Sequence, residues 1–292
     1  MKPGIYRGLS FDEYKAIEAV NKSSLDYMEQ SPLHFYTHCI DPKRAADAPT
    51  EAMQLGTAIH MCLLEPERFR DHYVVEPPGA PRRPTKAQIN AKKPAPETIE
   101  QIEFWARFDA ANKGREVLDR EEFETCLDLM RVVKSSDTAQ VLLQGGESEV
   151  TIVWDDEETG VRCKGRIDRL TPGAILDFKS TQDASKAAFL RQVENMEWDV
   201  QSAFYFDGMK ALGEECAFIF GALEKKPPRV AKFYAAHDEM LAVGRAIYRK
   251  RLKRYALCRK TGEWPGYADE IEDLKPSMWR QKQAAESGEG AA

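Results

Sequence analysis

The chain has 292 residues, of which 42% are hydrophobic and 31% are charged, and its formal net charge is −6. These fractions are ordinary for globular proteins, so they exclude wholesale disorder, a collagen-like repeat and a small scaffold that depends on disulfides. No apolar run approaches the ~20 residues that a membrane-spanning helix needs, and the first residues lack the pattern of a signal peptide. We therefore expect a cytoplasmic protein without a membrane partner.

Six cysteines lie far apart in the sequence, without a CxxC pair or a Cys/His cluster at zinc spacing, as expected in a reducing compartment. The acidic net charge argues weakly against a nucleic-acid partner, because phosphate contacts come from lysine and arginine. Two local runs argue for one: residues 82–93 hold five cations and residues 245–260 hold eight, with no acid in either. Both runs are candidate DNA contacts, and a solvated helix face is the alternative for the second.

The first part of the chain is predicted to be helical. Capping serines before an apolar pattern predict a helix from about residue 23, and a short helix follows within residues 31–38. Residues 50–64 are apolar or small at helical spacing, which predicts a buried helix that stops at Pro66.

The spacing of apolar residues changes in the second part of the chain. Six prolines among residues 76–98 predict a flexible basic loop. Helices follow near 99–112 and 119–144, and residues 147–181 then predict a three-strand meander with two tight turns. The remaining predicted elements are helices near 185–194 and 197–212, strands at 215–223 and 230–236, and a basic helix over 238–260.

These elements predict one organisation for the whole chain. An N-terminal helical segment, residues 1–75, carries the helix of His60 and belongs to the same fold. The flexible basic loop over 76–98 separates it from a core over 99–282, and residues 283–292 form a disordered polar tail.

The meander places two acids opposite each other. Asp177 and Lys179 are two apart on a predicted strand, so they share a face, while Leu176 and Phe178 point into the core. A two-residue turn at Pro172-Gly173 places Asp168 opposite Asp177. Opposed carboxylates repel unless a cation lies between them, which predicts a Mg²⁺ or Mn²⁺ site.

Other side chains extend this site. Lys179 is the predicted group that activates the attacking water, and Glu149 is a third carboxylate level with Asp168, with Glu147 as its alternative. Each has a structural alternative: a solvated ion pair for Asp177 and Lys179, and a core histidine for His60. Gln201 and Tyr205 share a helix face, and their structural alternative is a surface amide beside a half-buried ring.

Several short motifs occur together in a telling order. They are GTAIH at 56–60, Glu149, GRID at 165–168, DFK at 177–179 and QSAFY at 201–205. In order and spacing they resemble the RecB-like branch of the PD-(D/E)xK nucleases. The segment NKSSL, the run GTAIHMCLLEP, the DEETG turn and the closing WPGY resemble the RecE-type nucleases of phages and prophages.

This resemblance implies an α/β (α+β) fold with a central mixed sheet flanked by helices. It also implies a Mg²⁺-dependent exonuclease that digests linear double-stranded DNA from the 5′ end, with Mn²⁺ as a substitute. The resulting 3′ single strand would pass to a RecT-type annealing protein in the bacterial host cytoplasm. A ring-shaped homo-oligomer such as a tetramer is the family expectation, and the single cysteine near the C-terminus, Cys258, argues against an iron-sulfur cluster.

The resemblance also assigns residues to roles. It implies that Asp168, Asp177, Glu149 and His60 bind the metal ion, and that Lys179 activates water. It also implies that Gln201 and Tyr205 position the DNA end or the ligands. Separately from the resemblance, the candidate DNA contacts are Arg82, Arg83 and Lys86 of the basic run, together with Ser180 and Thr181.

Two other functions remain open at this point. A structure-selective or single-strand repair nuclease of the same clan would use identical metal chemistry. A DNA-end-binding module with a decayed catalytic site is the non-enzymatic alternative, and intact Asp168, Asp177 and Lys179 argue against it.

Overall fold

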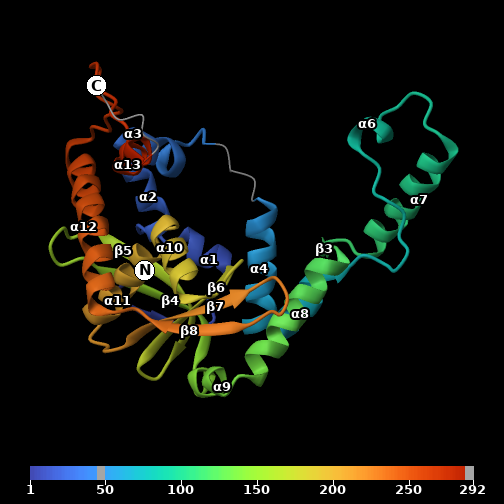
Figure 1. The fold of residues 1–292 in the computed structure, drawn as a ribbon, viewed down its shortest axis with the longest axis horizontal. Coiled ribbons are helices and arrows are strands. Elements are labelled where there is room, and N and C mark those ends of the chain that lie inside the picture. The colour runs from blue at the N-terminus through green and yellow to red at the C-terminus, as the bar shows by residue number, and fades with distance from the viewer. Residues whose placement is uncertain (45–49, 287–292) are drawn as a thin grey trace.

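The computed structural model describes residues 1–44 and 50–286, and its centre is a six-stranded sheet in the order β1-β4-β5-β6-β7-β8 (Figure 1). β6 and β7 run parallel, and every other neighbouring pair in this sheet is antiparallel. The predicted mixed sheet is therefore confirmed. Its strands are β1 (Gly4–Tyr6), β4 (Glu147–Asp155), β5 (Arg162–Thr171), β6 (Ala174–Thr181), β7 (Ala217–Glu224) and β8 (Ala231–Ala235).

The meander of β4, β5 and β6 has the predicted register. Gly173 takes a φ of 77° in the turn between β5 and β6, a left-handed conformation that glycine adopts without strain. Thr171 pairs with Ala174 and Arg169 with Leu176, after which β5 and β6 separate and β6 continues along β7. The separation begins at the level of Asp168.

Helices cover both faces of the sheet (Figure 1). On one face, Leu176 and Phe178 join an apolar cluster with Ile59 and Leu129. This face is covered by α4 (Glu51–Leu64), α8 (Arg120–Ser135) and α9 (Asp137–Leu143). On the other face, Ile175 belongs to a second cluster, covered by α2 (Lys22–Gln30), α10 (Lys186–Asn195), α11 (Trp198–Ala211) and α12 (Asp238–Thr261).

Further elements complete the fold. α7 (Pro96–Ala111) confirms the helix predicted near 99–112, and α3 (Pro32–Phe35) lies in the short helix predicted within 31–38. The other helical elements were not predicted as such; they are α1 (Phe11–Ala16), the π-helical turn η1 (Tyr36–Ile40), α5 (Pro66–His72), α6 (Lys86–Ile89) and α13 (Met278–Glu286). The parallel pair β2 (Tyr73–Val75) and β3 (Glu116–Leu118) forms a second, small sheet. Three-residue strands carry too few side chains to show a period of two.

The single helix expected over 119–144 is wrong, because the chain forms α8 and α9 instead. Ser136 separates them with an extended backbone, and its side chain accepts a hydrogen bond from Ala139 N–H at the start of α9. A serine inside an apolar pattern can cap a new helix instead of continuing the old one.

The structure also corrects the expectation of an unstructured loop over 76–98. Residues 76–113 form an arm that projects from the body of the protein, with α6 and α7 in it and the β2–β3 pair at its base (Figure 1). Trp105 of α7 donates a hydrogen bond to Pro81 O (2.9 Å), and the Arg83 guanidinium lies 3.9 Å from the Trp105 ring centre. The proline-rich segment therefore packs on α7.

At the end of the chain, residues 283–286 belong to α13, which corrects part of the expected disordered tail. Residues 287–292, the rest of that tail, lie outside the described residues. Among residues 1–44 and 50–286, no helix combines the length and apolar character of a membrane span.

Candidate active site

Strand β6 presents Asp177 and Lys179 on the face that α11 covers. Their neighbours Leu176 and Phe178 are fully buried in the opposite cluster, as the alternation along the strand predicts. Asp177 is only 1% exposed, and the side chain of Lys179 is largely buried as well. A carboxylate this deep needs close partners, because burial without them is costly.

Gln201 of α11 joins Asp177 and Lys179 into one chain of polar contacts. Its Nε2 donates to Asp177 Oδ1 (2.9 Å), and its Oε1 accepts from Lys179 Nζ (3.0 Å). Lys179 Nζ also lies 2.8 Å from Asp177 Oδ2, in an ion pair that lacks hydrogen-bond geometry. Asp177 Oδ2 is therefore a buried carboxylate oxygen without a hydrogen-bond donor among the described residues.

Asp168 lies where β5 and β6 separate. Its Oδ2 accepts a hydrogen bond from the backbone N–H of Phe178 (2.9 Å), and His60 Nδ1 lies 3.3 Å from the same oxygen. Burial raises the pKa of Asp168; the His60 charge opposes this shift and the Asp177 charge adds to it. The helix α4 thus brings His60 to the acids, where its side chain is partly exposed.

Glu149 stands level with Asp168, at an interruption of the β4–β5 ladder. The pairs on either side keep one register, so no residue is inserted at the interruption. The backbone of Glu149 has a φ of 56°, a left-handed conformation that residues other than glycine rarely adopt. Local strain of this sort is held by the surrounding structure and occurs often at functional sites.

The Glu149 carboxylate is paired with Arg166, the arginine of the GRID motif. Burial raises the pKa of Glu149, and the nearby Asp168 charge adds to that effect. Arg166 also donates to Leu9 O (3.0 Å), which ties the pair to the N-terminal segment. The sequence analysis assigned no role to Arg166.

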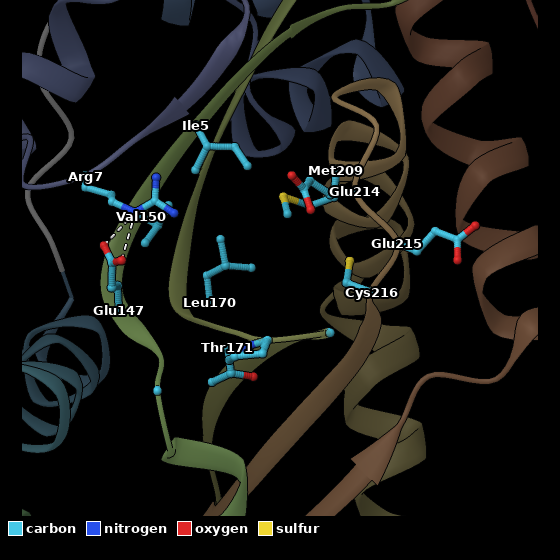
Figure 2. A pocket seen from close by; sticks show the side chains of 13 residues that line it. Ile5, Arg7, Glu147, Val150, Leu170, Thr171, Met209, Glu214, Glu215 and Cys216 are labelled. Atoms are coloured by element: carbon cyan, nitrogen blue, oxygen red, sulfur yellow. Dashed lines mark hydrogen bonds and ion pairs between the residues drawn. The ribbon is translucent and has the colours of Figure 1, made fainter.

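Glu147, the alternative to Glu149, lies at a different place. Figure 2 shows it beside a cavity of about 220 Å³, where its carboxylate is 2.8 Å from Arg7. The lining of this cavity includes the Pro172-Gly173 turn. The structure therefore brings Glu149, and not Glu147, next to Asp168.

Tyr205 is a core residue beneath the site. It is 8% exposed, and burial raises the pKa of its hydroxyl well above the usual value. Its ring lies so close to Gly165 of the GRID motif that a Cβ there would be 2.8 Å from Tyr205 Cε1. Gly165 thus lets β5 approach α11, and Tyr205 supports the strand that carries Asp168.

Trp198 was missed by the sequence analysis. Lys179 Nζ lies 5.3 Å from the centre of the Trp198 ring, within the range of a cation–π contact. Trp198 and Gln201 are three residues apart at the start of α11, so one helical turn brings both to Lys179. This i, i+3 spacing was the available signal.

An open cavity of about 490 Å³ borders His60 and Glu149. The GTAIH motif contributes Gly56 and Thr57 to its wall, and Arg166 lines it as well. Nothing lies within 4 Å of the position that a Cβ on Gly56 would occupy. The cavity wall therefore has open space beside Gly56.

The predicted DNA-contacting residues are spread over the molecule. Ser180 and Thr181 end β6, and Thr181 is buried with its hydroxyl bonded to Gln192. In the arm, Arg82 and Lys86 are exposed. Arg83 forms an ion pair of 2.9 Å with Asp109 in addition to its Trp105 contact.

Much of the basic run 245–260 is occupied by acids of the same chain. Four of its eight cations form ion pairs: Arg245, Arg249, Arg251 and Lys253. α12 therefore uses much of its charge to hold the fold.

Other side chains of the protein contact the carboxylates of the site. Arg166 pairs with Glu149, Gln201 with Asp177, and His60 with Asp168. Accordingly, within the described part of the chain no three histidine, cysteine or carboxylate side chains converge closely enough to hold a metal ion. The donor set nevertheless fits Mg²⁺ or Mn²⁺, because Asp177 Oδ2 lacks a donor and these ions prefer carboxylate oxygens.

Comparison with known proteins identifies the family. Residues 21–276 match the family described as a PDDEXK-like domain of unknown function (DUF3799). The chain belongs to this PDDEXK-like family. No curated protein is significantly similar to it in sequence.

A solved structure of low sequence identity shares the fold of this chain. A crystal structure described as a putative exonuclease from Eubacterium rectale is 14% identical, with a TM-score of 0.57 over 94% of this chain and 98% of that one. A phage-related exonuclease from Haemophilus somnus is 12% identical, with a TM-score of 0.31 over 62% of this chain and 92% of that one. The first of these likenesses supports the fold.

Proposed function

We infer that this PDDEXK-like domain is a metal-dependent nuclease that digests linear double-stranded DNA from its 5′ ends. The observation that carries the proposal is the chain of contacts from Asp177 through Gln201 to Lys179, beside Asp168. A buried acid, an amine and a second acid within one site are the groups that phosphodiester hydrolysis requires.

Each residue would have a separate role. Asp168 and Asp177 would hold the metal ion, with Glu149 and His60 completing the set once Glu149 leaves Arg166. The metal would stabilise the negative charge that develops on the phosphoryl group. Lys179 would hold and help deprotonate the attacking water, and Gln201 would keep the Lys179 amine directed at it.

The direction of digestion and the partners rest on the RecE-type resemblance of the sequence. We propose digestion of the 5′-ended strand, which leaves a 3′ single strand for a RecT-type annealing protein in the bacterial host cytoplasm. A ring-shaped homo-oligomer would enclose the duplex and keep the enzyme on its substrate.

The arm is the proposed contact to the duplex beyond the active site. Lys86, Lys92 and Lys93 are exposed in and after α6, and no acid lies among residues 82–93. Such cations bind phosphates irrespective of base sequence. Arg83 would instead hold the arm in shape, because Asp109 and Trp105 already occupy its guanidinium.

Digestion of linear duplex labelled at the 5′ or the 3′ end, with and without Mg²⁺, tests the function. We expect Mg²⁺-dependent release of the 5′ label first, with closed circular DNA left intact. Early release of a 3′ label would contradict the polarity. Nicking of supercoiled circles would favour the structure-selective nuclease, and end binding without cleavage would favour the decayed module.

A further inference from the structure

The helix α11, which carries Gln201 and Trp198, begins in an unusual way. Glu197 is its N-cap residue and has φ 54° and ψ 38°, the left-handed conformation. A side chain at an N-cap normally accepts a hydrogen bond from the first turn, but Glu197 makes no such bond. Something else must therefore hold the start of the helix.

Arg251 of α12 provides that hold. Its two terminal nitrogens donate to the two carboxylate oxygens of Glu197, each at 2.7 Å, in a bidentate pair. Arg251 is 3% exposed and the Glu197 side chain is 33% exposed, so water reaches this pair only from the Glu197 side. These bonds lower the pKa of Glu197 and keep it ionised.

The N-terminal helix α2 joins the same network. Arg251 reaches Asp26 (3.3 Å) and Glu29 (3.2 Å) as well as Glu197. Lys22, in the NKSSL segment, lies 2.9 Å from Asp26 and 3.9 Å from Glu197. Two helices far apart in the sequence thus converge on the residue at which α11 begins.

The backbones meet at the same place. A Cβ on Gly244 of α12 would lie 2.2 Å from the backbone oxygen of Asp199, which shows how closely α12 approaches the first turn of α11. Glu197 O in turn accepts the backbone N–H of Gln201 (3.2 Å). A shift of Glu197 would therefore move both side chains that contact Lys179.

We propose that the pair of the buried Arg251 with Glu197, with Lys22 and Asp26 beside it, is a positioning device that sets Gln201 and Trp198 against Lys179. These residues act through α11 and touch no reacting atom. The proposal rests on the nuclease function proposed above and adds to it a part of the machinery that lies outside the motifs.

The chain offers a matched control for the test. Arg245 of α12 makes a second bidentate pair across the same two helices, to Asp207, with both distances 2.6 Å. Asp207 lies more than one helical turn beyond Gln201, so this pair joins α11 to α12 without contacting the first turn. R251M and E197Q are therefore compared with R245M.

Kinetics on labelled linear duplex give the first readout. We expect R251M and E197Q to lower kcat about tenfold or more with KM changed less than twofold, and R245M to change kcat less than twofold. In a W198F/Q201A background, R251M should lower kcat less than twofold further, because its effect passes through these two side chains. Equal losses in R251M and R245M, or additive losses with W198F/Q201A, would overturn the proposal.

A second readout does not depend on cleavage. With 5-fluorotryptophan incorporated, the ¹⁹F resonance of Trp198, assigned by W198F, should shift in R251M and E197Q and stay in place in R245M. An unmoved Trp198 resonance in folded R251M would overturn the positioning role. If the wild-type protein cleaves no DNA while the resonance shifts as expected, the nuclease proposal fails and the structural device stands.

Discussion

The side chains of Asp177 and Lys179 project from the same face of β6 and form an ion pair of 2.8 Å. Asp177 Oδ2 nevertheless has no hydrogen-bond donor among the described residues. The pair sits where β6 is flanked by β7 on one side and diverges from β5 on the other. Because the strands diverge there, the Phe178 N–H donates to the Asp168 carboxylate. This hydrogen bond holds the second acid beside the pair.

Removing either member of the pair should abolish cleavage. We expect D177N and K179A to lose at least 100-fold in kcat, since each removes several kcal/mol of transition-state stabilisation. Initial rates on end-labelled duplex measure the loss. K186A, an exposed lysine at the start of α10, serves as the control and should keep its rate; a tenth of the wild-type rate retained by K179A would refute the assignment.

Without metal, D168N should stabilise the fold. Burial raises the pKa of Asp168, so the folded state binds a proton more tightly than the unfolded state. The wild-type protein should therefore gain stability as the pH falls from 7 towards the ordinary carboxyl range, and D168N should lose that dependence. Urea unfolding of the wild-type protein and D168N in EDTA, at pH 5 and pH 7, tests this. If the wild-type protein gained stability relative to D168N between pH 5 and pH 7, the prediction would be contradicted.

Metal dependence can be separated from DNA binding. We expect turnover with Mg²⁺ or Mn²⁺ but only binding with Ca²⁺, because Mg²⁺ requires near-octahedral geometry at ~2.0 to 2.1 Å and Ca²⁺ coordinates more loosely. Fluorescence anisotropy of a labelled duplex reports binding, and product release reports turnover. Full activity in excess EDTA would exclude the metal mechanism.

Two glycines should respond to alanine in opposite ways. G165A introduces a Cβ 2.8 Å from the Tyr205 ring, so we expect a loss of about 1–3 kcal/mol in unfolding free energy. G56A meets nothing within 4 Å in a helix and should gain up to about 1 kcal/mol. Thermal unfolding measures the stability of both variants. The double variant G165A/Y205L should recover part of the stability that G165A loses. Equal stability changes in G165A and G56A would contradict the close approach of β5 to α11.

The arm should contribute salt-dependent binding. The triple variant K86A/K92A/K93A should weaken duplex binding and reduce the slope of log Kd against log salt by about 3, since each phosphate contact contributes ~0.9. R83A should instead weaken the packing of the arm on α7 and make the Pro81 segment more sensitive to proteolysis. An unchanged salt slope in the triple variant would remove the arm from the DNA path.

The sequence by itself determined the strand faces and the register at the centre of the site. Alternation along 175–179 and a two-residue turn at Pro172-Gly173 are local properties, and they fix the pairing of β5 with β6 as far as Arg169 and Leu176, the positions next to Asp168 and Asp177. They fix this pairing because side-chain direction repeats every two residues and a tight turn leaves one pairing.

Only the tertiary structure decided the partners of these acids. Arg166 on Glu149, Trp198 under Lys179 and the Arg251–Glu197 pair depend on how α2, α11 and α12 pack, which no local period encodes. The same holds for the arm, whose prolines predicted a flexible loop, while in the structure Trp105 supplies a surface on which the Pro81 segment packs. Contacts between residues far apart in sequence depend on how the helices pack, because that packing is determined by side chains from the whole chain and not by any local segment.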